Sequence, residues 1–258
     1  MKDFLNDFFT QFTKAGSRLL MLDYDGTLAP FRVERYRAFA YPGVEQRLDR
    51  IIAGAKTDVV IISGRAIADL RPLLKLRKYP EMWGSHGWEV LSAEGKYRLL
   101  PAEADARQGL IKAENYIRDN GFAEHLEVKP VSLAIHYRGV EIHKLLVMKE
   151  KISNNWNSLT SEYNLTFSEF DGGLELKIPG LNKGTVVKTL TERYSVDCPT
   201  AYLGDDLTDE DAFKALPDSA LSVLVRPVYR ETKAKAWIKP PEELLEFFDR
   251  WIEADDIS

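Results

Sequence analysis

The chain has 258 residues, 45% hydrophobic and 29% charged, so its composition predicts one large or two small globular domains with a packed core. Its 35 basic and 40 acidic residues give a net charge of −5, which argues against nonspecific nucleic-acid binding. The single cysteine, Cys198, excludes an internal disulfide and favours a reducing cytoplasm, and we expect neither a signal peptide nor a membrane-spanning segment.

Helical and strand patterns alternate through the first part of the chain, residues 1–104. The pattern predicts helices near residues 3–14, 43–55 and 65–75, strands at 18–23 and 57–62, and a hairpin over 88–100. The middle part, 105–178, changes character. Its predicted order is a helix, two strands, a second helix over 142–159, and two strands joined by a turn at Asp171-Gly172-Gly173. This order is typical of a small antiparallel sheet backed by two helices. The alternation resumes over 179–258, which we group with residues 1–104 as one α/β domain.

Asp23 and Asp25 directly follow the apolar run 19–22, and Gly26 then indicates a turn. Side chains at i and i+2 of an extended segment share one side, so both carboxylates are expected to face the crevice beyond the strand's carboxyl end. Two carboxylates this close need a proton or a cation between them, and a hard cation such as Mg²⁺ suits oxygen ligands. The alternative is an ordinary turn, because Asp and Gly both favour turns.

Three further polar segments strengthen the chemical interpretation. Ser63 follows the second apolar strand, where it either caps the next helix or donates to a phosphate. Lys183 is predicted in the first turn of a helix, where the dipole disfavours a cation; a bound anion would explain it, and a solvated surface lysine is the alternative. The stretch 205–211 holds five acids in seven residues after another apolar strand, more than helix capping requires.

These four motifs, in this order, resemble those of the haloacid-dehalogenase-like phosphatase superfamily. The resemblance implies an α/β fold in which a Rossmann-like parallel-sheet core carries an inserted α+β cap (105–178), a lid over the active site that supplies specificity. By the same resemblance Asp23 is the nucleophile, Asp25 is the general acid/base, and Ser63 and Lys183 hold the phosphoryl oxygens. The implied Mg²⁺ ligands are Asp23, Asp25 and Asp205, with Asp206 or Asp209 either binding the ion directly or contacting its ligands.

The predicted cap strands carry alternating charges: Glu127 and Lys129 share one face of their strand, and Glu175 and Lys177 alternate in the same way in theirs. Such residues are most often simply solvated, but they can also bind sugar hydroxyls. The stretch 127–132 followed by His136-Tyr137-Arg138 is similar to the trehalose-6-phosphate phosphatases, as are residues 84–87, 175–184 and 204–210. This resemblance implies sugar contacts from Glu127, Lys129 and Glu175. It adds as further substrate-binding candidates Arg65, His86, His136 and Arg138, although His86 is equally explained as a turn residue.

The resemblance implies an enzyme that hydrolyses trehalose 6-phosphate with Mg²⁺ through an aspartyl-phosphate. Its implied partner is a small sugar phosphate, with no nucleic acid or membrane. A functional link to a trehalose-phosphate synthase is a further expectation that the sequence alone does not decide. Two alternatives remain: a phosphatase of sucrose phosphate or mannosyl-3-phosphoglycerate, and a non-catalytic regulatory domain. The arginine- and aromatic-rich stretch 32–41 has no chemical assignment.

Overall fold

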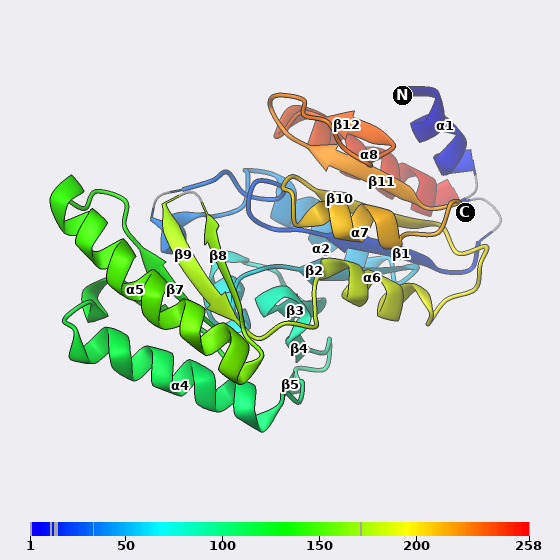
Figure 1. The fold of residues 1–258 in the computed structure, drawn as a ribbon. Coiled ribbons are helices and arrows are strands. Elements are labelled where there is room, and N and C mark those ends of the chain that lie inside the picture. The colour runs from blue at the N-terminus through cyan, green and yellow to red at the C-terminus, as the bar shows by residue number, and fades with distance from the viewer. Residues whose placement is uncertain (1, 11, 13–14, 33, 171, 258) are drawn as a thin grey trace. The chain divides into compact units, whose positions relative to one another are not determined.

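The computed structural model describes residues 2–10, 12, 15–32, 34–170 and 172–257 and divides the chain into two compact units. The first unit is formed by Met1–Arg98 and Leu181–Ser258, and the second by Leu99–Gly180. Figure 1 shows the elements of both. None of the described helices is long and apolar enough to cross a membrane.

A sheet of eight strands forms the centre of the first unit, in the order β12-β11-β10-β1-β2-β3-β4-β5. Neighbouring strands from β12 to β3 run parallel, and β4 pairs antiparallel with β3. Because β2 lies on one side of β1 and β10 on the other, the strand order reverses at β1. The strands are β1 (Arg18–Leu22), β2 (Thr57–Ile62), β3 (Glu81–Gly84), β4 (Glu89–Leu91), β5 (Tyr97–Leu99), β10 (Thr200–Gly204), β11 (Leu221–Val225) and β12 (Ala236–Ile238).

Helices cover both faces of this sheet, which is why its central strands are continuous apolar runs. On one face, Leu20 and Leu22 of β1 join a buried cluster with Leu48 of α2 and Trp251 of α8. On the other face α6 and α7 lie side by side (Figure 1). The helices are α1 (Lys2–Thr10), α2 (Val44–Ala53), α3 (Ile67–Leu70), α6 (Lys183–Thr191), α7 (Asp209–Ala215) and α8 (Glu242–Ile257).

The second unit is an antiparallel sheet in the order β6-β7-β9-β8, with α4 and α5 in contact with each other (Figure 1). The sheet buries Leu133, Leu174 and Leu176, and Phe167 packs edge-on against Trp156 of α5. Successive side chains alternate, so the opposite face of the sheet carries the polar residues. The elements are α4 (Ala104–Asp119), β6 (Leu126–Val128), β7 (Ser132–His136), α5 (Ile142–Tyr163), β8 (Thr166–Phe170) and β9 (Gly173–Lys177).

The predicted α/β class with a parallel sheet is confirmed. Two helices differ in length from the prediction. The helix predicted near 65–75 is only α3 followed by a 3-10 turn, Arg71–Leu73, because Pro72 has no N–H to continue an α-helix. The helix predicted over 142–159 extends to Tyr163 and ends at Asn164 in the left-handed conformation. Residues 11, 13 and 14 of the first predicted helix, and Asp171 of the predicted turn, lie outside the described residues.

Candidate active site

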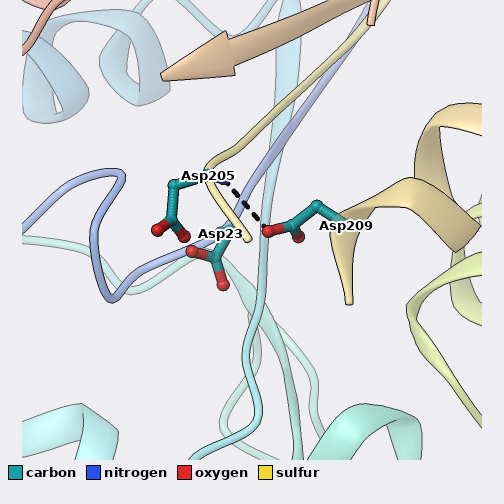
Figure 2. Close-up of side chains that lie close together, drawn as sticks. All are labelled: Asp23, Asp205 and Asp209. Atoms are coloured by element: carbon teal, nitrogen blue, oxygen red, sulfur yellow. Dashed lines mark hydrogen bonds between the residues drawn. The ribbon is translucent and has the colours of Figure 1, made fainter. Parts of the chain in front are cut away.

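Carboxylates gather where β1 and β10 end, at the point where the strand order reverses. Asp23 follows β1, Asp205 follows β10, and Asp209 begins α7. One carboxylate oxygen from each of the three lies within 4.8 Å of the others, and all three residues are buried (Figure 2). Parallel sheets bind ligands at this switch point, because the carboxyl ends of the two strands open a crevice there. The cluster therefore lies where a ligand is expected.

Lys183 joins two of these carboxylates. It is the first residue of α6, whose N-terminus is closed by reciprocal hydrogen bonds between Asn182 and Thr185. Its Nζ lies 2.6 Å from Asp23 Oδ1 and 2.7 Å from Asp209 Oδ1. Lys183 is only 4% exposed, so the alternative of a solvated surface lysine is wrong. The two carboxylates supply the negative charge that offsets a cation at a helix N-terminus.

Asp209 accepts hydrogen bonds on both carboxylate oxygens. Besides Lys183, Oδ1 accepts from the hydroxyl of Tyr202 at 2.5 Å. Oδ2 accepts from the backbone N–H groups of Asp205 at 3.1 Å and Asp206 at 2.9 Å. A Cβ on Gly204 would lie 2.4 Å from the Asp209 carboxyl carbon, so glycine is needed for this close packing. Asp209 therefore fixes the loop that carries Asp205.

Asp25 faces a different partner from Asp23. Both of its oxygens accept from the guanidinium of Arg65 at 2.5 Å, and its side chain is 26% exposed. Asp23 instead accepts from the Thr27 hydroxyl at 3.0 Å on its second oxygen. Directly after Asp25 the chain turns at Gly26 with φ +82°, and a Cβ there would lie 2.2 Å from Asp205 Oδ2. Glycine is thus required by both the backbone angle and the approach of Asp205.

The electrostatics of the cluster fit a cation. Burial raises the pKa of Asp23 to about 7, with Lys183 opposing the shift and Asp209 adding to it. Burial also raises the pKa of Asp205 to about 9, and repulsion from Asp23 and Asp209 adds to it. For Lys183 burial lowers the pKa, but its two carboxylate neighbours outweigh that effect and the pKa is raised. A hard cation beside Asp23 and Asp205 would relieve the repulsion, and an oxygen-only donor set matches Mg²⁺.

Ser63 lies in a loop against Arg65 and His86. Its hydroxyl accepts from the Arg65 N–H at 3.1 Å, and its carbonyl accepts from the His86 N–H at 3.0 Å. It does not cap α3, whose N-cap position is Ala66. His86 has φ 56°, and a Cβ on Gly64 would lie 2.7 Å from its ring, so the ring packs directly on that glycine. The geometry places His86 beside the Ser63 loop and gives it a turn conformation.

Asp206 differs from its neighbours, because its side chain is exposed and its contacts at the site are made by its backbone. Its carbonyl accepts from Arg230 at 2.7 Å. The Asp205 carbonyl accepts from Arg226 at 3.2 Å and from Arg230 at 3.3 Å. These two arginines, together with Tyr202 and Thr27, touch the site and were not among the residues predicted from sequence.

The predicted sugar-binding residues of the second unit form one cluster on the polar sheet face. Glu127 Oε2 lies 2.7 Å from His136 Nε2 and 4.0 Å from Lys129 Nζ. Glu175 Oε1 accepts from Lys129 at 3.4 Å and from the Ser132 hydroxyl at 3.1 Å. The alternation of side chains along the strands brings these residues to one face, since Glu127 and Glu175 both lie opposite Ala134 in the sheet. Outside the strands, Arg138 packs over Gly172 in the adjoining turn.

Solved structures define the class of fold. The C-terminal domain of Candida albicans trehalose-6-phosphate phosphatase aligns with 98% of this chain and 97% of its own, at a TM-score of 0.76 and 23% identity. A haloacid-dehalogenase-like hydrolase from Bacillus subtilis aligns with 91% of this chain and 99% of its own, at a TM-score of 0.58 and 17% identity. The chain thus has the haloacid-dehalogenase-like fold.

Curated relatives are similar in sequence. Trehalose-6-phosphate phosphatase of Escherichia coli (strain K12) is 29% identical over 74% of this chain and 70% of its own. The bifunctional trehalose-6-phosphate synthase/phosphatase of Thermoproteus tenax is 31% identical over 84% of this chain and 30% of its own. The chain spans about a third of the length of that protein and of a Dictyostelium discoideum trehalose-phosphate synthase. The family model of the trehalose-phosphatases matches residues 21–239, and the chain belongs to that family.

Proposed function

We propose that this protein hydrolyses trehalose 6-phosphate to trehalose and phosphate through an aspartyl-phosphate on Asp23. The observation that carries the proposal is the setting of Asp23. It is a buried carboxylate at the carboxyl end of β1, with Lys183 on one oxygen and Thr27 on the other. These contacts fix its direction, and fixed direction is what an attacking group needs. Family membership and the names of the relatives support the substrate.

In the first half of the reaction an Asp23 oxygen attacks phosphorus and the bond from phosphorus to the sugar oxygen breaks. Asp25 gives its proton to that departing oxygen. In the second half Asp25 takes a proton from the water that attacks the aspartyl-phosphate, which releases phosphate and restores Asp23. The proton taken from water serves the next leaving group, so the cycle balances. Arg65 donates to both oxygens of Asp25 and so fixes the direction of that carboxyl group.

Asp23 and Asp205 are the proposed side-chain ligands for Mg²⁺, with the backbone carbonyl of Asp25. When bound, the ion neutralises charge on the phosphoryl oxygens. Asp209 has donors on both oxygens, which favours it as the residue that holds Lys183 and the Asp205 loop in place. The exposed side chain of Asp206 is the weaker candidate ligand. Ser63 and Lys183 are proposed to bear the charge of the transferred group.

Residues 105–178, which lie within the second unit, are proposed to act as the specificity cap. The side chains of Lys129 and Glu175 are charged, yet they are only 10% and 14% exposed on the polar sheet face. With Glu127 they offer both acceptors and donors, which sugar hydroxyls need because each hydroxyl donates and accepts. His136 is proposed to assist through its contact with Glu127. Arg65, Arg138 and His86 remain proposed substrate contacts.

The relatives also support a metabolic link. One of them is named as both synthase and phosphatase of trehalose 6-phosphate, and another as a synthase. We infer that the substrate of this chain is supplied by such a synthase. The buried, free thiol of Cys198 supports the proposal that the protein works in a reducing cytoplasm.

A substrate panel tests the proposed function. Phosphate release is measured with trehalose 6-phosphate, glucose 6-phosphate, sucrose 6-phosphate and mannosyl-3-phosphoglycerate, each in Mg²⁺ and in EDTA. We expect the highest kcat/KM for trehalose 6-phosphate, loss of activity in EDTA, and recovery on adding Mg²⁺ but only poorly with Ca²⁺. A higher kcat/KM for another sugar phosphate overturns the substrate, and full activity in EDTA overturns the metal.

A further inference from the structure

One aromatic residue interrupts the polar face of the sheet in the second unit. The strand β8 is an edge strand of this sheet (Figure 1). Phe170 is its last residue, and 38% of Phe170 is exposed. Phe167, three residues earlier, lies on the opposite face against Trp156. Among the described strand residues, those that share the face with Phe170 are small, polar or charged: Thr166, Ser168, Glu127, Ser132, Ala134, His136, Gly173, Glu175 and Lys177.

The strand register places Phe170 beside the charged cluster. Phe170 pairs with Gly173, and Gly173 pairs in turn with His136. A Cβ on Gly173 would lie 2.0 Å from the Phe170 ring, so the ring covers the glycine directly. The His136 ring stands edge-on to it, with centroids 5.7 Å apart, and its Nε2 lies 2.7 Å from Glu127. Glu127, His136 and Phe170 therefore lie in a row, with a carboxylate next to an imidazole and the imidazole next to an exposed phenyl ring.

This combination matches the surface of a hexopyranose. One face of such a ring is made of C–H groups, while the hydroxyls project around its rim. A phenyl ring can take the C–H face out of water, and carboxylates and an imidazole at its edge can bind the hydroxyls. We propose that Phe170 is a platform for a glucose ring of the disaccharide, with the hydroxyls of that ring bound by Glu127 and His136. The proposal rests on the proposed function and names a residue that recognises its sugar.

A structural role for Phe170 predicts something different. An aromatic ring over a glycine in a neighbouring strand stabilises that strand pair, and this alone could place Phe170 where it is. In that case its loss would lower thermal stability and leave the choice of substrate unchanged. The two roles separate when stability and substrate preference are measured on the same variants.

The test compares F170L, F170Y and F167L with the wild type on trehalose 6-phosphate and p-nitrophenyl phosphate, alongside Tm. F170L is expected to raise KM for trehalose 6-phosphate about fivefold or more, because leucine offers a smaller apolar surface and no flat ring to cover the sugar. Its kinetics with p-nitrophenyl phosphate should stay within about twofold, since that ester carries no sugar. F170Y keeps the ring and should retain the wild-type KM. F167L is the control on the opposite face, and it should lower Tm without changing substrate preference.

Each outcome decides the proposal. An unchanged KM for trehalose 6-phosphate in F170L overturns it, whether or not Tm falls. Equal losses on both substrates overturn it too, because they indicate a general structural defect. If the wild type fails to turn over trehalose 6-phosphate, the proposed function falls and this inference falls with it. If the wild type turns over trehalose 6-phosphate and F170L has the same KM, only the role of Phe170 is overturned and the proposed function stands.

Discussion

Lys183 Nζ lies 2.6 Å from Asp23 Oδ1, although the two residues are 160 positions apart in the chain. Both are almost fully buried. One lies at the carboxyl end of β1 and the other at the first turn of α6, so the fold itself brings a cation to the proposed nucleophile. The contact orients Asp23, and in the proposed reaction it would keep Lys183 beside the phosphoryl group that Asp23 receives.

Replacing Lys183 by methionine should impair both activity and stability. The variant keeps the volume but leaves Asp23 and Asp209 without their shared cation. Because breaking a buried ion pair strands a charge, the free energy of unfolding should fall by about 3 kcal/mol, measured in urea without metal. Turnover of trehalose 6-phosphate should fall by about a hundredfold or more at a temperature where the variant is folded. A K183M protein with wild-type turnover would show that the lysine serves stability alone.

Tyr202→Phe should slow catalysis while the protein remains folded. In the wild type the Tyr202 ring packs edge-on against Phe213, with centroids 5.8 Å apart, and phenylalanine keeps that ring. Asp209, however, loses one of its hydrogen-bond donors. Asp209 then holds Lys183 less firmly, and we expect kcat to fall about tenfold with little change in KM. Tyr194→Phe is the matched control, since its hydroxyl donates to Asp58 at 2.8 Å and touches none of the clustered carboxylates. Equal effects of the two variants would contradict a positioning role.

The stability of the metal-free protein should depend on pH in a defined direction. The folded-state pKa values of Asp23 and Asp205 are raised to about 7 and about 9, so the folded protein holds protons that the unfolded chain has released. The contribution of these two groups to the free energy of unfolding should therefore be greatest near pH 4, and it should fall as the pH rises toward 9.

Thermal unfolding in EDTA over this range measures the effect. Saturating Mg²⁺ should raise Tm most at the alkaline end, where both carboxylates are ionised. Asp205→Asn should flatten the EDTA profile above pH 7, because it removes the group that titrates there. A Tm that rises with pH in EDTA for wild type, but not for D205N, would contradict the assignment of repulsion to this pair.

Substitutions in the polar cluster of the second unit should affect sugar substrates selectively. Glu127→Ala or Glu175→Ala leaves a sugar hydroxyl without its partner, a loss of about 1–3 kcal/mol, and kcat/KM for trehalose 6-phosphate should fall accordingly. Hydrolysis of p-nitrophenyl phosphate should change little. Comparable losses on both substrates would mean that these residues support the fold or the chemistry instead.

The carboxylate motifs could be predicted because each follows an apolar run that ends at the same edge of a parallel sheet. Tyr202 could not, since within the run 201–203 it reads as another core residue, and only the tertiary structure shows its hydroxyl on Asp209. Arg65 was predicted to bind substrate, yet nothing in its sequence context pairs it with Asp25, 40 residues away. The short strand β12 was not placed individually, because three residues give no usable periodicity.

The stretch 32–41 remains without a chemical role, although part of it is now placed. The Arg35 carbonyl accepts from Arg65 at 3.0 Å, which ties this stretch to the residue that holds Asp25. Phe31, Tyr36 and Phe39 are exposed at or beside it. The sequence could not indicate this, because a loop conformation fixed by distant contacts leaves no periodic pattern.

Asp23→Asn tests the central claim most directly. The amide has nearly the same shape as the carboxylate but cannot attack phosphorus, so circular dichroism should show a folded protein. Phosphate release from trehalose 6-phosphate in Mg²⁺ is measured for wild type and variant side by side. We predict clear turnover by the wild type and a loss of about ten-thousandfold or more in the variant. Turnover by D23N within about tenfold of the wild type would contradict a covalent role for Asp23.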